Sequence, residues 1–286
     1  ALARRLLAMM ERVEPWLPPA SVEIDWQHDI AALWQRHALG GQLMPVPPRD
    51  ALGLDDLLGI ERQKRALVDN TRAFLRGYPA NHALLWGARG SGKSSLVRAL
   101  LNGLAPEGLR LVQVDRHDLA GLPSLVAQLR NEPHRFVVYC DDLSFEGNDD
   151  AYKALKSVLD GAITGPPDNV LLYATSNRRH LLPESMSDNQ ETRVVNDELH
   201  HGDAVEERIS LSDRFGLWLA FHPFSQDAYL ETCQHWVAHL DAADGWSPEA
   251  RAEALRFATL RGGRSGRIAW QFACQWVGNR RLQAET

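Results

Sequence analysis

The sequence predicts an α/β fold, in which a parallel sheet lies between helices, joined to a second domain made of helices. Over residues 49–222, short apolar runs alternate with helical patterns, which is typical of a layered α/β domain. From Pro223 onward the pattern is helical throughout. We therefore expect three parts: a helical leader and linker over 1–48, an α/β domain over 49–222 and a helical domain over 223–286.

The strands of the expected sheet are short runs of branched apolar residues bounded by polar turns, as in parallel sheets buried on both faces. The five runs are His82–Trp86, Arg110–Val114, Phe136–Cys140, Val170–Thr175 and Leu217–Phe221. Helices are expected over Gly59–Arg76, Ser225–Leu240, Ser247–Leu260 and Ser265–Gly278, the last three beginning at serines that can cap a helix.

The leader has weaker signals. Apolar residues recur at helical spacing over 2–13 and again over Asp29–Leu39, where Ile30, Leu33 and Trp34 share a face, so two helices are expected. Pro45–Pro48 is typical of a linker. An apolar helix face near a terminus usually packs on its own domain, and docking of a partner is the alternative.

A complete phosphate-binding motif follows the first expected strand. Gly87–Ser94 is GARGSGKS, which matches G-x-x-x-x-G-K-[ST] between a strand and a helix. Glycines let backbone N–H groups point at an anion. The motif predicts that residues of this loop bind a nucleoside triphosphate, with Lys93 on its β- and γ-phosphates and Ser94 on Mg²⁺. The candidate nucleotide-binding residues are Gly87, Ala88, Arg89, Gly90, Ser91, Gly92, Lys93, Ser94 and Ser95.

A chance match in a glycine-rich loop is the alternative, and it is disfavoured because strand, glycines, Lys-Ser pair and helix occur in order. The side chain of Arg89 occupies a variable position of the motif and is expected to face solvent.

Composition excludes several classes of protein. Hydrophobic residues make up 44% and charged residues 24% of the chain, as in soluble globular proteins, and a net charge of −6 supplies no overall basic field for nucleic acid. No apolar run is long enough to span a bilayer, and the opening stretch has no signal-peptide pattern. Cys140, Cys233 and Cys274 lie in apolar segments, which indicates buried reduced thiols and a cytoplasmic protein. His235 and His239 lack the HExxH context of a metal site.

Two carboxylates end the strand Phe136–Cys140. In the pattern called Walker B, Asp141 would hold Mg²⁺ and Asp142 would act as general base toward the attacking water. The alternative is a strand that ends in a polar turn, which becomes less probable beside an intact phosphate-binding loop.

Three more polar residues are candidates for catalysis. Asn177 ends the strand Val170–Thr175 and can orient water or touch the γ-phosphate, unless it only closes an Asx turn. Arg214 precedes the last strand and can reach the nucleotide of a neighbouring subunit. A surface pair with Asp213 or Glu207 is the alternative, and Arg208 is the rival. Arg267 opens the last helix and can reach the nucleotide from the helical domain, with Arg264 as a close second.

In this order, the features resemble those of the AAA+ ATPases over about residues 50–278. The matches are Gly87–Ser94 for Walker A, Val137–Asp142 for Walker B, Asn177 for sensor 1, Arg214 for the arginine finger and Arg267 for sensor 2. Leu58-Gly59-Ile60 is similar to the segment that borders adenine, so Gly59 and Ile60 join the nucleotide-binding set. The stretch from Glu198 to Leu219 resembles a bacterial AAA+ family known only as a domain of unknown function.

The resemblance implies an AAA+ P-loop core with a helical lid, binding ATP and Mg²⁺. It also implies a nucleotide-dependent homo-oligomer that hydrolyses ATP between subunits to remodel or load a protein or nucleic-acid partner. Asp142 stands where many family members have glutamate, and the pair Asp141-Asp142 is similar to that of the initiator and helicase-loader branch. The shorter side chain implies slow turnover, with Glu146 as a candidate to assist. No aromatic residue occurs in Arg116–Pro123, the counterpart of the pore loop of unfoldases. These departures favour the alternative, a slowly hydrolysing switch or loader.

Two further expectations remain. The polar segment Arg178–Ile209 is longer than an ordinary loop, and it is expected either to contact a neighbouring subunit or partner or to be a mobile surface loop. A P-loop kinase acting on a small molecule is a third class of function, which the order of Asn177, Arg214 and Arg267 disfavours.

Overall fold

The structure, a computed structural model, describes residues 23–37, 40–47, 52–144, 150–161, 167–177, 193–195, 198–200, 211–240 and 245–285. All structural statements below concern these residues. The predicted helix over residues 2–13 lies outside them, as do Arg208, the rival of Arg214, and Glu146, the candidate assistant of Asp142. Most of Arg178–Ile209 also lies outside them. Within that last segment, β7 (Arg193–Val195) and β8 (Glu198–His200) form an antiparallel pair.

A seven-stranded sheet forms the centre of the larger part, in the order β2-β1-β4-β5-β6-β3-β9. The five predicted strands are confirmed as β3 (Ala83–Gly87), β4 (Leu109–Val114), β5 (Arg135–Cys140), β6 (Val170–Ser176) and β9 (Leu217–Phe221), and each is parallel to its neighbours. The P-loop strand β3 therefore lies between β6 and β9, so the polar ends of β5 and β6 lie at the same edge of the sheet as the phosphate-binding loop.

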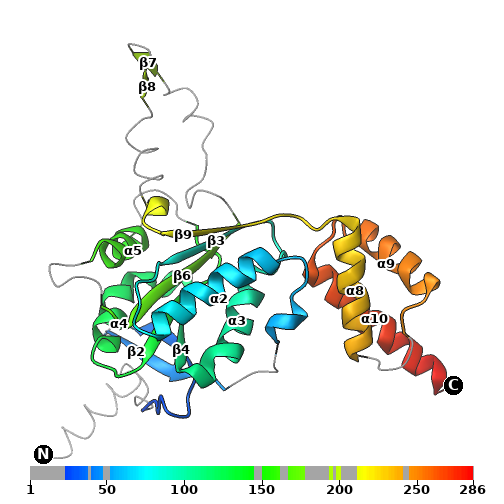
Figure 1. Cartoon of the computed structure of the whole chain (residues 1–286), viewed down its shortest axis with the longest axis horizontal. Coiled ribbons are helices and arrows are strands. Elements are labelled where there is room, and N and C mark those ends of the chain that lie inside the picture. The colour runs from blue at the N-terminus through cyan, green and yellow to red at the C-terminus, as the bar shows by residue number, and fades with distance from the viewer. Residues whose placement is uncertain are drawn as a thin grey trace, which may run out of the picture.

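Helices cover both faces of this sheet (Figure 1). One face packs against α2 (Glu61–Leu75) and α3 (Lys93–Leu104), and the other packs against α4 (Leu122–Leu129) and α5 (Asp150–Asp160). Strand β5 shows why its sequence is almost continuously apolar. Phe136, Val138 and Cys140 belong to one core cluster, whereas Val137 and Tyr139 belong to the other. Successive side chains of a strand point to opposite faces, so both sets are buried.

The prediction of a helix over Asp29–Leu39 was wrong. Residues Ala31–His37 form β1, which is parallel to β4, and Gly40–Pro45 form β2, which is antiparallel to β1. The predicted linker over Pro45–Pro48 therefore starts inside a strand. The physical reason is Trp34, which is almost fully buried against Gly41 and Gly121. A short apolar run fits helical and strand periods almost equally well, and tertiary packing decides between them.

Short 3-10 helices connect several of these elements. They are η2 (Leu54–Asp56), η3 (Ala105–Glu107) and η4 (Arg116–Gly121).

Three helices form the smaller part, which we call the lid: α8 (Gln226–Leu240), α9 (Pro248–Leu260) and α10 (Gly266–Ala284). The lid lies at one end of the sheet, beside the phosphate-binding loop (Figure 1). All three serine caps are confirmed, because Ser225, Ser247 and Ser265 accept hydrogen bonds from the backbone N–H three residues later at 3.1, 3.1 and 3.3 Å. Helix α10 continues past Gly278, where the sequence predicted its end.

The three cysteines are free thiols, and Cys140 and Cys233 are buried as predicted. Cys274 is exposed, so the prediction of a buried thiol was wrong there. It follows Ala273, which faces the lid core, and so it points outward on the amphipathic helix α10.

His82 connects the start of the P-loop strand to the neighbouring strand β6. It lies one residue before β3, and its Nδ1 accepts the backbone N–H of Leu172 at 3.0 Å. Burial lowers the pKa of His82 from 6.5 to about 4, so the folded protein keeps this imidazole neutral where the unfolded chain would protonate it.

We predict that this histidine makes stability fall with acidity. Between pH 6.5 and 4 the unfolded chain binds a proton that the folded protein excludes, so His82 should lower the free energy of unfolding by about 2 kcal/mol between pH 7 and pH 5. Urea unfolding at both pH values measures this loss. His82→Asn keeps an acceptor and should remove most of this loss. His222→Asn, which removes an exposed histidine, is the control. An equal loss in all three proteins contradicts the assignment.

Candidate nucleotide-binding site

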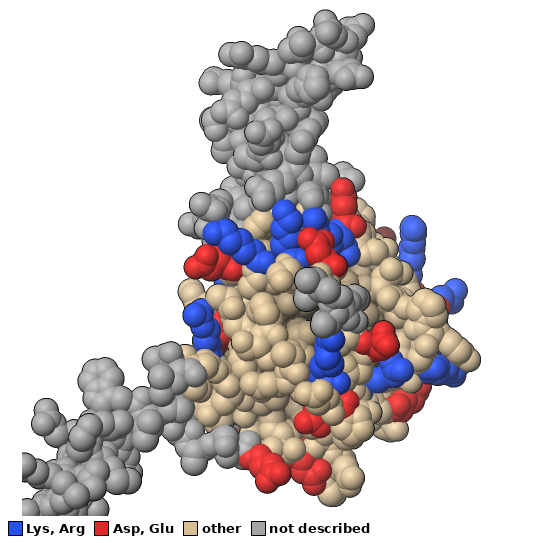
Figure 2. All heavy atoms as spheres, turned by 90° about the vertical axis from the view of Figure 1, so that its left-hand side faces the viewer, with Lys and Arg blue, Asp and Glu red and all other residues tan. Residues whose placement is uncertain are grey.

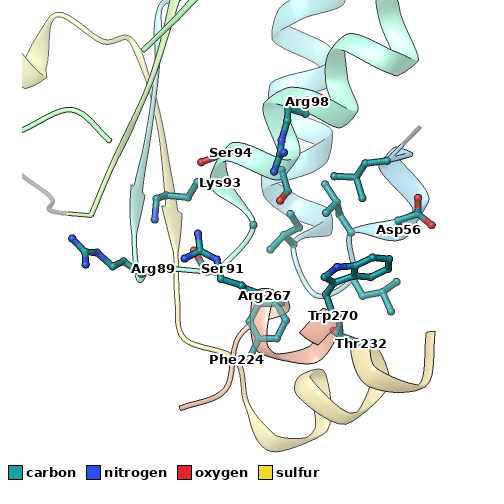
Figure 3. Close-up of a pocket in the computed structure, with 18 of the residues that line it drawn as sticks. Asp56, Arg89, Ser91, Lys93, Ser94, Arg98, Phe224, Thr232, Arg267 and Trp270 are labelled. Atoms are coloured by element: carbon teal, nitrogen blue, oxygen red, sulfur yellow. The ribbon is translucent and has the colours of Figure 1, made fainter. Parts of the chain in front are cut away.

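A pocket of about 770 Å³ opens where the carboxyl ends of the central strands meet the lid. Its lining comes from six stretches of the sequence: the segment before α2, the P-loop with the start of α3, the end of β5, the end of β6, helix α8 with the residue Phe224 before it, and the start of α10. Figure 3 shows Lys93 and Ser94 on one side, Trp270 and Asp56 on the other and Arg267 between them. The size lies within the range of ordinary ligand sites.

The P-loop forms the phosphate side of this pocket. Helix α3 begins at Lys93, directly after Gly92 in the left-handed region at φ 102°. Lys93 Nζ donates to the carbonyls of Gly87 and Ala88, both at 2.8 Å, and to Asn177 Oδ1 at 3.2 Å. Burial lowers the pKa of Lys93, while Asp142 and Asp141 oppose that shift. The ammonium group is thus held at the mouth of the loop between backbone and carboxylates.

The Asp141 carboxylate is the centre of a hydroxyl cluster. Its Oδ1 accepts hydrogen bonds from Tyr139 at 2.6 Å, Thr175 at 2.6 Å and Ser94 at 2.7 Å. Burial alone would raise the pKa of Asp141, but the hydrogen bonds from Thr175, Tyr139 and Ser94 outweigh it and lower the pKa below its usual value. The group is therefore ionised near neutral pH, and it lies beside the Ser94 hydroxyl as predicted.

Asp142 turns away from this cluster. It is the only residue other than glycine with a positive φ among those described, at 52°, and its N–H donates to Thr175 Oγ1 at 2.8 Å. Its Oδ1 accepts a hydrogen bond from Asn177 Nδ2. Asn177 therefore bridges Asp142 and Lys93, and the structure brings together the predicted general base, the sensor amide and the P-loop lysine.

The predictions from the sequence did not include Tyr139 and Thr175 among the site residues. Tyr139 lies two residues before Asp141, and alternation along β5 places both side chains on one face. That spacing was an available signal for Tyr139. Thr175 belongs to β6, and its contact with Asp141 depends on the pairing of Cys140 with Ala174, which no local pattern specifies.

The first turn of helix α10 closes the pocket on the side of the lid. Gly266 N donates to the carbonyl of Gly90 at 3.0 Å, and Arg267 lines the pocket beside the P-loop (Figure 3). Arg264, the rival residue, donates to Gln226 Oε1 at 3.3 Å and is not among the lining residues. Arg267 is thus the arginine that the lid presents to the pocket.

Of the segment predicted to border adenine, Leu58-Gly59-Ile60, two residues line the pocket. Ile60 lines the pocket with Leu57 and Leu58, whereas Gly59 does not. Among the predicted P-loop residues, Arg89 is exposed as expected and lines the pocket, while Gly87 and Ala88 contribute carbonyls behind Lys93 and do not line it.

Arg214 lies elsewhere in the same chain. It is not among the lining residues, and its Nε forms an ion pair with Asp160 at the end of α5. Glu207, named in the alternative of a surface pair, lies outside the described residues. The hydrogen bond that Arg214 donates to the Asp160 carboxylate raises the pKa of this guanidinium. Arg214 is therefore not part of the pocket of its own chain.

Metal-binding clusters of three or more His, Cys, Asp and Glu side chains do not occur in the described part of the chain. His235 instead pairs with Asp56 at 3.1 Å. No helix among the described residues is long and apolar enough to cross a membrane.

Comparisons with known proteins agree with this geometry. The family model DUF815, described as "Protein of unknown function", matches residues 27–280. The solved structure of Aeropyrum pernix Orc1 in complex with DNA is similar at 16% identity and a TM-score of 0.55, covering 80% of this chain and 65% of that one. A Thermotoga maritima RuvB mutant is similar at 18% identity and a TM-score of 0.50, covering 77% and 63%. Both are AAA+ ATPases, so the likeness shows this fold. No curated protein sequence matches significantly.

We predict that Gly90 is needed for docking of the lid on the P-loop. Gly90 has φ +75°, and a Cβ there would lie 2.8 Å from Ser265 Oγ. Gly90→Ala should therefore displace the start of α10 and weaken nucleoside triphosphate affinity by about tenfold or more, a change of about 1.4 kcal/mol measurable by calorimetry.

Gly262→Ala is the matched control, because Gly262 has φ +72° but nothing within 4 Å of the added Cβ. It introduces the same backbone strain of about 1–2 kcal/mol without the clash, so its nucleotide affinity should stay that of the wild type. Equal affinities for the two variants would argue against docking of the lid through Gly90.

Proposed function

The chain belongs to the DUF815 family and has the AAA+ fold, and from this premise we propose that it binds and hydrolyses ATP. The observation that carries the proposal is the meeting of Lys93, Asn177 and Asp142 beside the Ser94–Asp141 pair. A phosphate chain laid along the P-loop would place its terminal group next to these side chains, where an amide and a carboxylate can hold and polarise a water molecule.

The residues beside Ser94 suit a magnesium ion. Mg²⁺ prefers oxygen ligands and is usually bound by one or two carboxylates together with substrate phosphates. Ser94 Oγ and the ionised Asp141 Oδ1 are such oxygens and lie 2.7 Å apart. When bound, the ion would neutralise charge that develops on the transferring phosphoryl group. Tyr139 and Thr175 would keep Asp141 oriented through their hydrogen bonds.

Asp142 is the proposed general base. Its backbone conformation and the hydrogen bond from Asn177 direct the carboxylate toward Lys93 rather than toward Asp141. Arg267 would hold the phosphates from the lid, and closure of the lid would keep bulk water away from the reacting group.

We expect the chain to hydrolyse ATP slowly. Aspartate is one methylene shorter than the glutamate found at this position in many AAA+ proteins, and Asp142 already has a hydrogen-bonding partner in Asn177. Both features would reduce its reach toward a water molecule. A switch or loader that stays in its ATP-bound state for a long time fits these features better than a fast motor.

Arg214 is proposed to act between subunits. Arg214 lies far from the P-loop in the sequence and does not line the pocket of its own chain. Both facts fit a residue that reaches the nucleotide of a neighbouring copy. The ion pair with Asp160 would then have to be exchanged for the γ-phosphate on assembly. The oligomer would be nucleotide-dependent, because the terminal phosphate supplies the partner for Arg214.

The macromolecular partner is proposed to be a protein or a nucleic acid. On the face in Figure 2, Lys and Arg are interspersed with Asp and Glu, without a large field of one sign. Together with the net charge of −6, this disfavours strong non-specific binding of DNA from that face. The similar Orc1 structure is a complex with DNA, so turnover should be compared with and without duplex DNA.

Two substitutions separate binding from chemistry. Lys93→Ala removes a charged phosphate contact and should weaken ATP affinity by about 100-fold, whereas Asp142→Asn keeps the shape of the side chain and should keep affinity while turnover falls by about 100-fold. Calorimetry and phosphate release measure the two effects. Lys153→Ala on α5, which removes an exposed lysine, is the control for charge. Unchanged affinity in Lys93→Ala would refute the P-loop role.

A mixing experiment tests the finger. Arg214→Ala should bind ATP normally but lose turnover by at least about 100-fold, and an equal mixture with inactive Lys93→Ala should regain part of it. Recovery is expected because Arg214 of one variant reaches the intact pocket of the other. Arg256→Ala, which removes another arginine from an ion pair, should have no effect. Light scattering with a slowly hydrolysed ATP analogue reports assembly, and full turnover by Arg214→Ala alone rejects the finger.

A further inference from the structure

On the side of the pocket farthest from Lys93, the indole of Trp270 is only partly covered by neighbouring side chains. Trp270 of α10 lines the pocket and is 40% exposed, although most large apolar side chains of the described residues are buried. Figure 3 shows its ring on the same side of the pocket as Asp56 and Thr232, beyond Arg267. An exposed tryptophan inside a concave site offers a flat apolar surface to a ligand.

The ring plane of Trp270 is set by the neighbouring helix. Trp236 of α8 meets it at a centroid distance of 4.7 Å and an interplanar angle of 80°. Trp236 is itself held by His239 at 5.5 Å and 81°. Perpendicular aromatic contacts of this kind favour one orientation, so the indole is oriented before any ligand arrives and loses little entropy on binding.

The segment before α2 supplies other apolar walls of the same pocket. Leu57 and Ile60 line it with most of their surface buried, and Ile60 lies next to the P-loop, where its Cδ1 is 3.5 Å from a Cβ built on Gly92. The His235–Asp56 hydrogen bond of 3.1 Å ties α8 to η2 at this end of the pocket. The apolar part is therefore continuous with the phosphate loop and braced between lid and core.

Helix α10 carries both kinds of contact on one face. Arg267 lies beside the P-loop, and Trp270 follows three residues later, about one helical turn further along. A ligand with an anionic chain at one end and a flat aromatic group at the other would meet the guanidinium and the indole in that order. A purine nucleotide has this shape.

We propose that Trp270 stacks on the purine base of the bound nucleotide and, with Arg267, lets α10 sense the whole ligand rather than its phosphates alone. The inference rests on the proposed nucleotide site and adds a base contact to it. Stacking on an indole accepts adenine and guanine, so Trp270 supplies affinity for the base, and groups around Asp56 and Thr232 are left to choose between purines.

The test compares ligands with and without a base. Affinities for ATP and for inorganic triphosphate, each with Mg²⁺, are measured by calorimetry on the full chain. Trp270→Ala should weaken ATP binding by about tenfold, which corresponds to about 1.4 kcal/mol, and should leave triphosphate binding within about twofold. Trp270→Phe keeps an aromatic face and should recover most of the ATP affinity.

Fluorescence gives a second readout. ATP should quench tryptophan emission equally in the wild type and in Trp276→Phe, a control on the same helix outside the pocket lining. Quenching should be clearly smaller in Trp270→Phe, where Trp236 is the tryptophan left in the lining. Equal loss of ATP and triphosphate affinity in Trp270→Ala would mean that the indole only supports the lid, which overturns the proposal. A wild type that binds neither ligand would overturn the nucleotide site itself, and the base contact with it.

Discussion

The site depends on one charge, the carboxylate of Asp141 at the end of the buried strand β5. Partial loss of hydration there disfavours the ionised form, and three hydroxyl groups that donate hydrogen bonds to Oδ1 offset this effect. These donors come from β5, from β6 and from the first turn of α3, so the same hydrogen bonds that keep Asp141 ionised also hold the P-loop helix against the strand ends. The hydrogen bonds that stabilise this charge are therefore the same ones that assemble the site.

The Thr175 hydroxyl links that cluster to the second carboxylate. It donates to Asp141 and accepts from the backbone N–H of Asp142, which stabilises the positive φ of Asp142. The two adjacent aspartates consequently point in different directions, one toward Ser94 and the other toward Asn177 and Lys93. Two chemically identical residues thus acquire different roles through their surroundings, one as a proposed metal ligand and the other as a proposed base.

The lid adds a second level of organisation. A backbone hydrogen bond from Gly266 to Gly90 places α10 on the P-loop, and the His235–Asp56 pair joins α8 to the segment before α2. The pocket is therefore closed by contacts at both of its ends. A ligand that spans from Lys93 to Trp270 would add to these contacts, and it would thereby couple occupancy of the pocket to the position of the lid.

Local signals in the sequence determined most of the fold. Apolar runs identified the five central strands, serine caps located the lid helices, and the P-loop motif placed the phosphate site, because each depends on residues close together in the chain. Tertiary structure decided the rest. Residues 31–37 form a strand because Trp34 packs against Gly41 and Gly121. Thr175 reaches Asp141 through strand pairing, and Arg214 forms an ion pair with Asp160, which lies 54 residues away in the chain. Contacts between residues distant in sequence leave no local periodicity, so only the folded chain reveals them.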